Sequence, residues 1–191
     1  MTNFLRERKV INHISELQKL LPNFPTDILE QWFLPYVESN GMPWDKEGNT
    51  IGRWKYLLQN KPLHYWKNIL WDQIEAYIPI DEYCDEWKSV LLNMVEGAVL
   101  GKTNVYSISI NNLKERFDSV LEYLEAEKVF PKPPILLLEK DKGITVLDGN
   151  HRISAFLYSL SQHYRDKKDG KIDTLPMLKQ RYWIGINREN K

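Results

Sequence analysis

The sequence predicts an α+β fold, in which a helical N-terminal region precedes a small mixed sheet with packed helices. The chain has 191 residues, 42% of them hydrophobic, which is enough for one compact domain with a helical extension. Up to about residue 100, apolar residues recur mainly at helical spacing. Beyond it, short apolar runs alternate with helical patterns, as in α+β domains. These observations predict two parts, a tryptophan-rich helical region over residues 1–100 and a sheet-containing domain over 101–191.

The N-terminal region is marked by its tryptophans, six of which precede residue 100. They are interleaved with Leu, Ile and Val, which favours an aromatic core. A row of exposed rings that stacks on bases or sugars is the alternative. The sequence TDILEQWFLPYV (26–37) predicts a helix that Pro35 bends or ends, and residues 85–101 predict another helix.

The C-terminal part predicts strands and helices in alternation. The expected strands are 105–110, 135–138, 144–147 and one or two over 175–186, and the expected helices are 111–128 and a second from about residue 150. Gly143 lies in the short linker between the two middle strands, where a hairpin turn needs a positive φ. The two runs that it joins are therefore expected to pair with each other.

The composition argues against several classes of protein. The 26 Lys and Arg are balanced by 26 Asp and Glu, whereas proteins that bind duplex DNA usually carry a basic excess. A nucleic-acid partner is therefore not expected. Cys84 is the single cysteine, and no Cys/His cluster has zinc spacing. The sequence shows no secretory signal and no apolar run near the ~20 residues of a membrane span, which predicts a cytoplasmic protein without a membrane partner.

Two short motifs resemble ligand loops but lack required residues. The sequence GKT at 101–103 is not a Walker A motif, because Glu96 occupies the position five residues before Gly101. The sequence DKEGN at 45–49 lacks the glycine and glutamate that an EF-hand loop needs at its sixth and twelfth positions. Both motifs predict turns.

The strongest candidate site is Asp148-Gly-Asn-His-Arg152, called the box below, between the apolar run ITVL and a helical pattern. Gly149 permits a sharp turn and the close approach of a ligand. The helix that follows begins with unpaired N–H groups, which bind anions. Because a cation at a helix N-terminus opposes the macrodipole, Arg152 is expected to bind a phosphate or other anion. Its removal is then expected to leave stability nearly unchanged.

The other side chains of the box have several open roles. Asp148 is expected to orient His151 or Arg152, to hold Mg²⁺ or to act as a base. A purely structural interpretation is the alternative, in which Asp148 and Asn150 cap the helix and Arg152 pairs with a surface acid.

The segment PPILLLEKDKGITVLDGNHRISAFLYSL (133–160) resembles the core of the ParB/sulfiredoxin-like superfamily. Members show a Pro-Ile strand, a hairpin and a Gly-x-(His/Arg)-Arg sequence that opens a helix. The matching residues are Pro134-Ile135, Gly149-Asn150-His151-Arg152 and Ala155. With flanking strands the resemblance covers about residues 105–186. It implies a pocket in which the box contacts the phosphates of ATP or CTP, with Mg²⁺ as a further ligand.

The resemblance also implies a reaction. A free-serine kinase branch uses the same pocket with an acidic base after its first strand, where this chain has Glu115. The expected function is nucleotide binding with phosphotransfer to a small-molecule or protein acceptor, or NTP hydrolysis. The residues implied are Asp148, His151 and Glu115 for catalysis, Gly149, Asn150, His151, Arg152 and Ser154 for the nucleotide, and Asp148 for the metal.

Two departures separate this chain from well-known branches of that superfamily. Asn150 stands where sulfiredoxins carry their catalytic cysteine, and no helix-turn-helix follows the box as it does in partition proteins. Two alternatives stay open, namely a non-catalytic nucleotide-sensing or protein-interaction module, and a ParB-like nucleic-acid-binding protein or nuclease. Nucleotide turnover separates the enzyme from the module, and salt-sensitive DNA binding would favour the last alternative.

Overall fold

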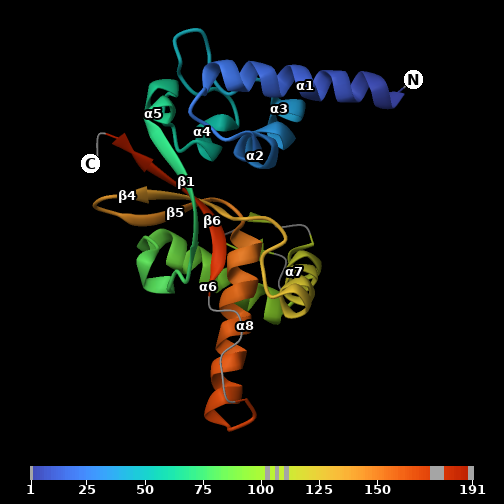
Figure 1. The fold of residues 1–191 in the computed structure, drawn as a ribbon, viewed down its shortest axis with the longest axis vertical. Helices are drawn as coiled ribbons and strands as arrows, with labels where there is room; N and C mark the ends of the chain where they lie inside the picture. Colours follow the sequence, from blue (N-terminus) through green and yellow to red (C-terminus); the bar gives the residue numbers. More distant parts are fainter. Residues whose placement is uncertain (1, 102–103, 106–107, 110–111, 173–178, 189–191) are drawn as a thin grey trace. The chain divides into compact units, whose positions relative to one another are not determined.

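A computed structural model describes the chain except for residues 1, 102–103, 106–107, 110–111, 173–178 and 189–191 (Figure 1). The fold is α+β with a four-stranded mixed sheet, as the sequence predicts at this level. The chain forms two compact units, one of Met1–Asp72 with Gly185–Lys191 and one of Gln73–Ile184. The assignment of nucleotide binding to residues 101–191 stays a prediction.

The first unit is built mainly from short helices around an aromatic core. Its helices are α1 (Thr2–Leu20), α2 (Thr26–Ile28), a π-helical segment (Leu29–Phe33), α3 (Leu34–Asn40), α4 (Trp54–Leu57) and α5 (Leu63–Lys67). The Trp32 and Trp66 rings are both buried and meet at 5.4 Å, edge to face. Trp54 is also buried and stacks on Phe33 at 5.5 Å. Such ring pairs favour edge-to-face or offset geometry, and the predicted aromatic core is confirmed.

Pro35 does not end the helix in which it lies. The helical run continues from Thr26 to Asn40, and the five residues before α3 are π-helical. The N–H of Leu34 donates to the carbonyl of Leu29, five residues back. Proline lacks the N–H of a regular α-helical hydrogen bond, and the π-helical segment ends two residues before it.

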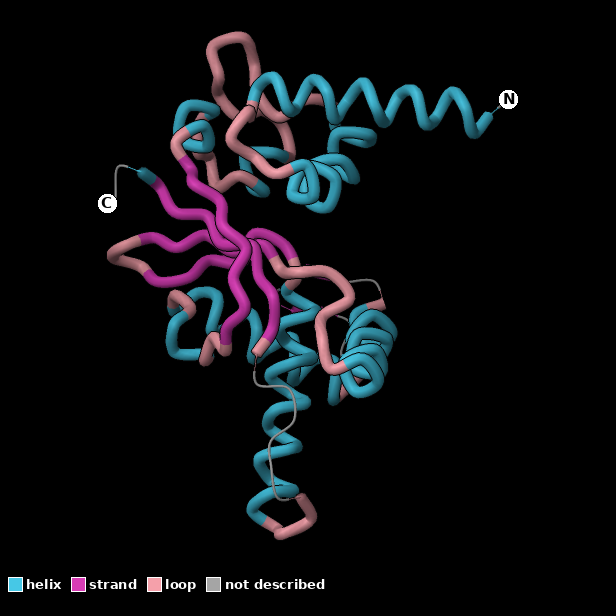
Figure 2. The backbone as a smooth tube through the Cα atoms, viewed as in Figure 1, coloured by secondary structure: helices cyan, strands magenta, loops and turns pink. Residues whose placement is uncertain are grey.

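The second unit packs three helices against most of a sheet that is drawn in magenta in Figure 2, and residues 69–72 and 185–187 of this sheet belong to the first unit. The sheet order is β1-β6-β4-β5, with β1 (Ile69–Ala76), β6 (Gln180–Asn187), β4 (Ile135–Glu139) and β5 (Gly143–Asp148). The helices are α6 (Asp85–Val99), α7 (Leu113–Glu127) and α8 (Asn150–Lys168), with a 3₁₀ turn at Ile80–Glu82. One core joins them, with Leu136 and Val146 from the sheet against Leu91, Phe117 and Phe156 from the helices.

The hairpin of β4 and β5 is confirmed, whereas two other strand predictions need correction. Strand β1 lies in a region predicted to be helical, although its residues 73–76 alternate between exposed and half-buried as a strand does. The run 105–110 is not one strand, because β2 (Asn104–Val105) and β3 (Ile108–Ser109) pair antiparallel with each other. Of the predicted closing strands, β6 is present, and residues 175–178 lie outside the described part.

Within the described residues, none of the helices has the length and hydrophobicity that a membrane crossing requires.

Gln180 anchors the start of β6 in the second unit. Its side chain is 1% exposed. Its Oε1 accepts the Phe130 N–H at 2.8 Å, and its Nε2 donates to the Lys128 carbonyl at 3.0 Å. One amide thus satisfies two backbone groups of the segment between α7 and β4.

We expect Gln180→Ala to lower the free energy of unfolding by about 1–3 kcal/mol, because a buried backbone N–H loses its acceptor. Urea unfolding of both proteins measures the change. Gln73→Ala, at an exposed position of β1, is the control and should stay within about 0.5 kcal/mol of the parent protein. Equal effects of the two substitutions would contradict the anchoring role.

Candidate functional site

The box lies where the sequence predicts, at a strand-to-helix junction. Strand β5 ends at Asp148, Gly149 has a φ of 103°, and α8 begins at Asn150. The Ile153 N–H donates to the Gly149 carbonyl at 3.0 Å, which is the first hydrogen bond of the helix. Because glycine has no side chain, it cannot cap the first turn, and the amides of Asn150, His151 and Arg152 have no side-chain cap from it.

The strand changes register just before the box. Val146 pairs with Leu136 and Asp148 pairs with Ile135, so Leu147 is an extra residue in the β4–β5 ladder. The apolar run ITVL before the box predicts that Leu147 is buried, and this prediction is wrong because Leu147 is half-buried. Such a bulge turns the following side chains away from the regular alternation of a strand, and here it sets the direction of the Asp148 carboxylate.

Gly149 is required by both conformation and space. Its φ lies in the left-handed region that other residues rarely adopt. A Cβ at this position would meet Pro134 Cβ at 2.9 Å and the Arg152 guanidinium at 3.1 Å. The turn therefore brings the backbone close to the loop before β4 and to the arginine of its own helix.

Arg152 is bound by groups of the protein itself. Its Nη2 donates to Asp148 Oδ2, and its Nη1 donates to the Lys132 carbonyl at 2.7 Å. The side chain is only 13% exposed. This arrangement joins the end of β5, the start of α8 and the segment that leads into β4. It matches the structural alternative, in which Arg152 pairs with an acid, and it leads us to expect that removal of Arg152 lowers stability.

His151 contributes a buried and unsatisfied polar atom to the box. Its Nε2 is buried and has no hydrogen bond among the described residues. Burial lowers the pKa of His151 to about 4, the positive charges of Arg116 and Arg152 lower it too, and Asp148 opposes them. The imidazole is therefore neutral near pH 7. Arg116 lies in the first turn of α7 and is exposed, so α7 brings a cation to the box that the sequence reasoning missed.

Two predicted site residues do not join the box. Ser154 is fully buried and donates to the Leu91 carbonyl of α6 at 3.2 Å, so its hydroxyl is engaged within the core, and its contact with a nucleotide stays a prediction. Glu115 is exposed, and it is not among the charges that act on His151. Glu115 differs in this from its neighbour Arg116, because each residue of a helix is rotated by 100° from the one before it and neighbouring side chains therefore point in different directions.

The described residues at the box do not form a metal site by themselves, and the prediction that Asp148 holds Mg²⁺ beside a bound phosphate stays a prediction. Asp148 is engaged by Arg152, and the described part of the chain has no group of three or more His, Cys, Asp or Glu placed to hold a metal ion. Mg²⁺ usually needs one or two carboxylates in addition to substrate phosphates. No chemical step is therefore assigned to a metal at Asp148.

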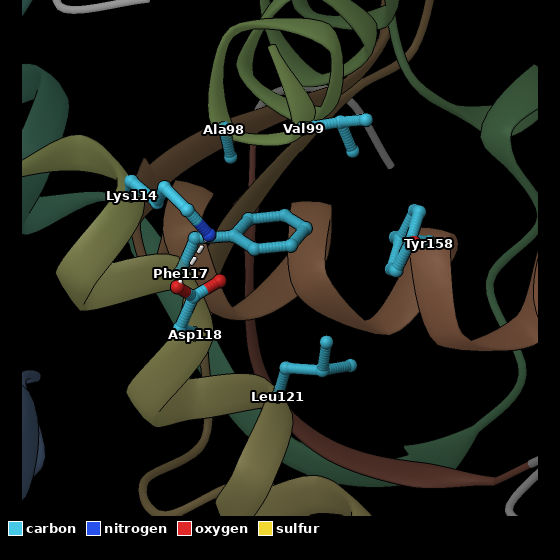
Figure 3. Close-up of a pocket in the computed structure, with 7 residues that line it drawn as sticks. All are labelled: Ala98, Val99, Lys114, Phe117, Asp118, Leu121 and Tyr158. Atoms are coloured by element: carbon cyan, nitrogen blue, oxygen red, sulfur yellow. Dashed lines mark hydrogen bonds and ion pairs between the residues drawn. The ribbon is translucent and has the colours of Figure 1, made fainter. Parts of the chain in front are cut away.

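A separate pocket lies among the three helices of this unit. It is lined by Ala98 and Val99 of α6, by Lys114, Phe117, Asp118 and Leu121 of α7, and by Tyr158 of α8 (Figure 3). Lys114 and Asp118 form an ion pair of 2.7 Å at this pocket. The volume is about 170 Å³, below the 300–1,000 Å³ typical of sites for drug-sized ligands. It contains no residue of the box and is too small to enclose a nucleotide.

Comparison with protein-family models, with curated proteins and with solved structures found no match to this chain. The interpretation of the box therefore depends on its geometry and chemistry.

We expect Arg152→Ala to lower the free energy of unfolding by about 1.5–3 kcal/mol, because charge-assisted hydrogen bonds to Asp148 and the Lys132 carbonyl are lost. Chemical denaturation measures the change. Arg165→Ala, at an exposed position near the far end of α8, removes the same charge from the same helix as a control. A stability loss no larger than that of the control would show that the contacts of Arg152 are not stabilising.

The low pKa of His151 predicts a dependence of stability on pH. The folded state keeps the imidazole neutral down to about pH 4, whereas the unfolded chain protonates it near pH 6.5. The unfolded state therefore binds more protons between these values, and stability falls as the pH is lowered from 6.5 toward 4. By linkage, protonation of His151 alone lowers the free energy of unfolding by about 2 kcal/mol between pH 7 and pH 5. Urea titrations at the two pH values measure the loss of unfolding free energy, and His151→Gln should reduce this loss by the contribution of His151. An equal loss in the variant and the parent protein would contradict the low pKa of His151.

Proposed function

We propose that this chain binds a nucleotide through its phosphates at the N-terminus of α8. Gly149, Asn150 and His151 form the cradle, and Arg116 supplies the cation. The observation that carries the proposal is the buried and unpartnered Nε2 of His151 beside uncapped helix amides. Buried polar atoms are nearly always hydrogen-bonded in native proteins, so a partner from a ligand is the expected completion.

The charges around the box support an anionic ligand. Arg116 and Arg152 both act on His151, and Asp148 is the acid among the charges that do so. Arg152 already neutralises Asp148, so the positive charge of Arg116 remains for the ligand. A neutral imidazole can donate one N–H to a phosphate oxygen, and the helix amides donate as well. The choice of a nucleotide over another phosphate compound rests on the resemblance of residues 133–160 to the ParB/sulfiredoxin-like superfamily.

The same geometry supports binding more directly than turnover. A general base works best with a pKa near the working pH, whereas the pKa of His151 is about 4. Asp148 is engaged by Arg152, and Glu115 is exposed and is not among the charges that act on His151. Phosphotransfer or NTP hydrolysis is therefore kept as a hypothesis, and the non-catalytic nucleotide-binding module is the form of the function that we propose.

A thermal-shift screen with ATP, CTP, GTP and ADP tests this function, because a ligand that binds the folded state raises the melting temperature. We expect at least one triphosphate to stabilise the protein, and inorganic phosphate to do so less at equal concentration. Product analysis of the same mixtures should show no turnover. Released phosphate would instead establish an NTPase, and the absence of any nucleotide shift would overturn the proposal.

We expect Arg116→Gln to weaken binding of the best nucleotide about tenfold, because a charge-assisted contact to phosphate contributes roughly 1.5 kcal/mol. Since Arg116 is exposed, the melting temperature of the free protein should change little. Lys114→Gln is the matched control, because it removes one positive charge from the same turn of α7 at a side chain that lines the other pocket. Isothermal titration calorimetry of the three proteins measures the affinities, and equal losses in both variants would argue against a specific role for Arg116.

A further inference from the structure

A second basic site lies in the first unit, between the turn at residues 45–49 and helix α5. A pocket of about 200 Å³ is lined there by Lys46, Glu47, Gly48, Leu63, His64 and Lys67. The three basic side chains are exposed and come from two separate elements. They share the pocket with a single carboxylate, that of Glu47.

The frame of this pocket is held by backbone hydrogen bonds. In the turn, the Asp45 N–H donates to the Asn49 carbonyl at 3.0 Å, and the Asn49 N–H donates to Asp45 Oδ1 at 2.7 Å. The Leu63 N–H donates to the Gly48 carbonyl at 2.9 Å, which ties the turn to α5. The two sides of the pocket therefore hold a defined distance without a ligand, and such preorganisation favours binding.

Helix electrostatics do not explain this arrangement. His64 and Lys67 lie in the last turn of α5, where cations favour the macrodipole, but α5 has only five residues and Lys46 is not on it. The segment 46–67 contains five Lys or Arg and one acidic residue, in a chain whose net charge is zero. Cations that converge on one hollow repel one another, and a bound anion would remove that repulsion.

We propose that this pocket binds the phosphate group of a small phosphate monoester. The two ammonium groups and the imidazole offer N–H donors to a tetrahedral group, and lysine is a common phosphate ligand. A dianion matches the charges of Lys46 and Lys67 better than a carboxylate, which has one charge. The pocket is smaller than the 300–1,000 Å³ of typical sites for drug-sized ligands, so it takes the phosphate group rather than a whole nucleotide. It shares no residue with the box.

An NMR titration of the full chain with glycerol phosphate at fixed ionic strength tests this site. We expect saturable shifts at residues 46–48 and 63–67 with a Kd on the order of 1 mM, as for a few exposed ionic contacts. Lys67→Gln and Lys46→Gln should each weaken binding about fivefold, and Glu47→Gln should strengthen it about twofold to fivefold. Residue-resolved shifts separate this site from the box, so failure here would not bear on nucleotide binding.

Two comparisons make the outcome decisive. Lys55→Gln removes an exposed lysine of the same unit that does not line the pocket, and it should leave the affinity unchanged. Acetate, a monoanion, should bind at least fivefold more weakly than glycerol phosphate. Equal losses in Lys55→Gln and Lys67→Gln, no gain in Glu47→Gln, equal binding of acetate, or shifts that do not saturate would each overturn the proposal.

Discussion

One guanidinium group organises the candidate site. Arg152 donates to Asp148 at the end of β5 and to the Lys132 carbonyl before β4, while its own backbone lies in the first turn of α8. The contiguous β5–α8 junction is thereby held against the segment before β4, 20 residues earlier in the sequence. Gly149 makes this possible, because only a residue without a Cβ leaves room for Pro134 and the guanidinium at that turn.

The hydrogen bonds of Arg152 limit which groups of the box are available to a ligand. Arg152 neutralises Asp148, so neither side chain is available as a separate charge. His151 is left half-buried without a hydrogen-bond partner for Nε2 in the described part of the protein, and the positive charge that acts on it from another element comes from Arg116. A site that holds a neutral donor next to a cation suits the recognition of an anion better than proton transfer at neutral pH.

The two proposed anion sites differ in how their charges are assembled. At the box, a half-buried imidazole lies in the first turn of a helix, and the charge of one arginine from α7 acts on it. In the first unit, exposed lysines and a histidine surround a shallow pocket whose frame is a hydrogen-bonded turn. The first arrangement favours a desolvated contact with a phosphate group, whereas the second favours a weaker contact that salt screens.

Local sequence determined the features that depend on nearby residues. The apolar run before Asp148, the glycine and the helical spacing after it predicted the strand, turn and helix of the box, and the tryptophans interleaved with aliphatic residues predicted an aromatic core. Only tertiary packing decided which distant groups interact with the side chains of the box and its helix. The sequence could not show that Arg152 meets a carbonyl 20 residues earlier, that Ser154 turns to α6, or that the charge of Arg116 acts on His151. Strand β1 was missed because its mixed polar pattern becomes a strand only through pairing with β6, far along the chain. These outcomes depend on which face of a helix and which edge of a strand meet. A shift of one residue turns a helix side chain to another direction, and it moves every strand side chain to the other face of the sheet.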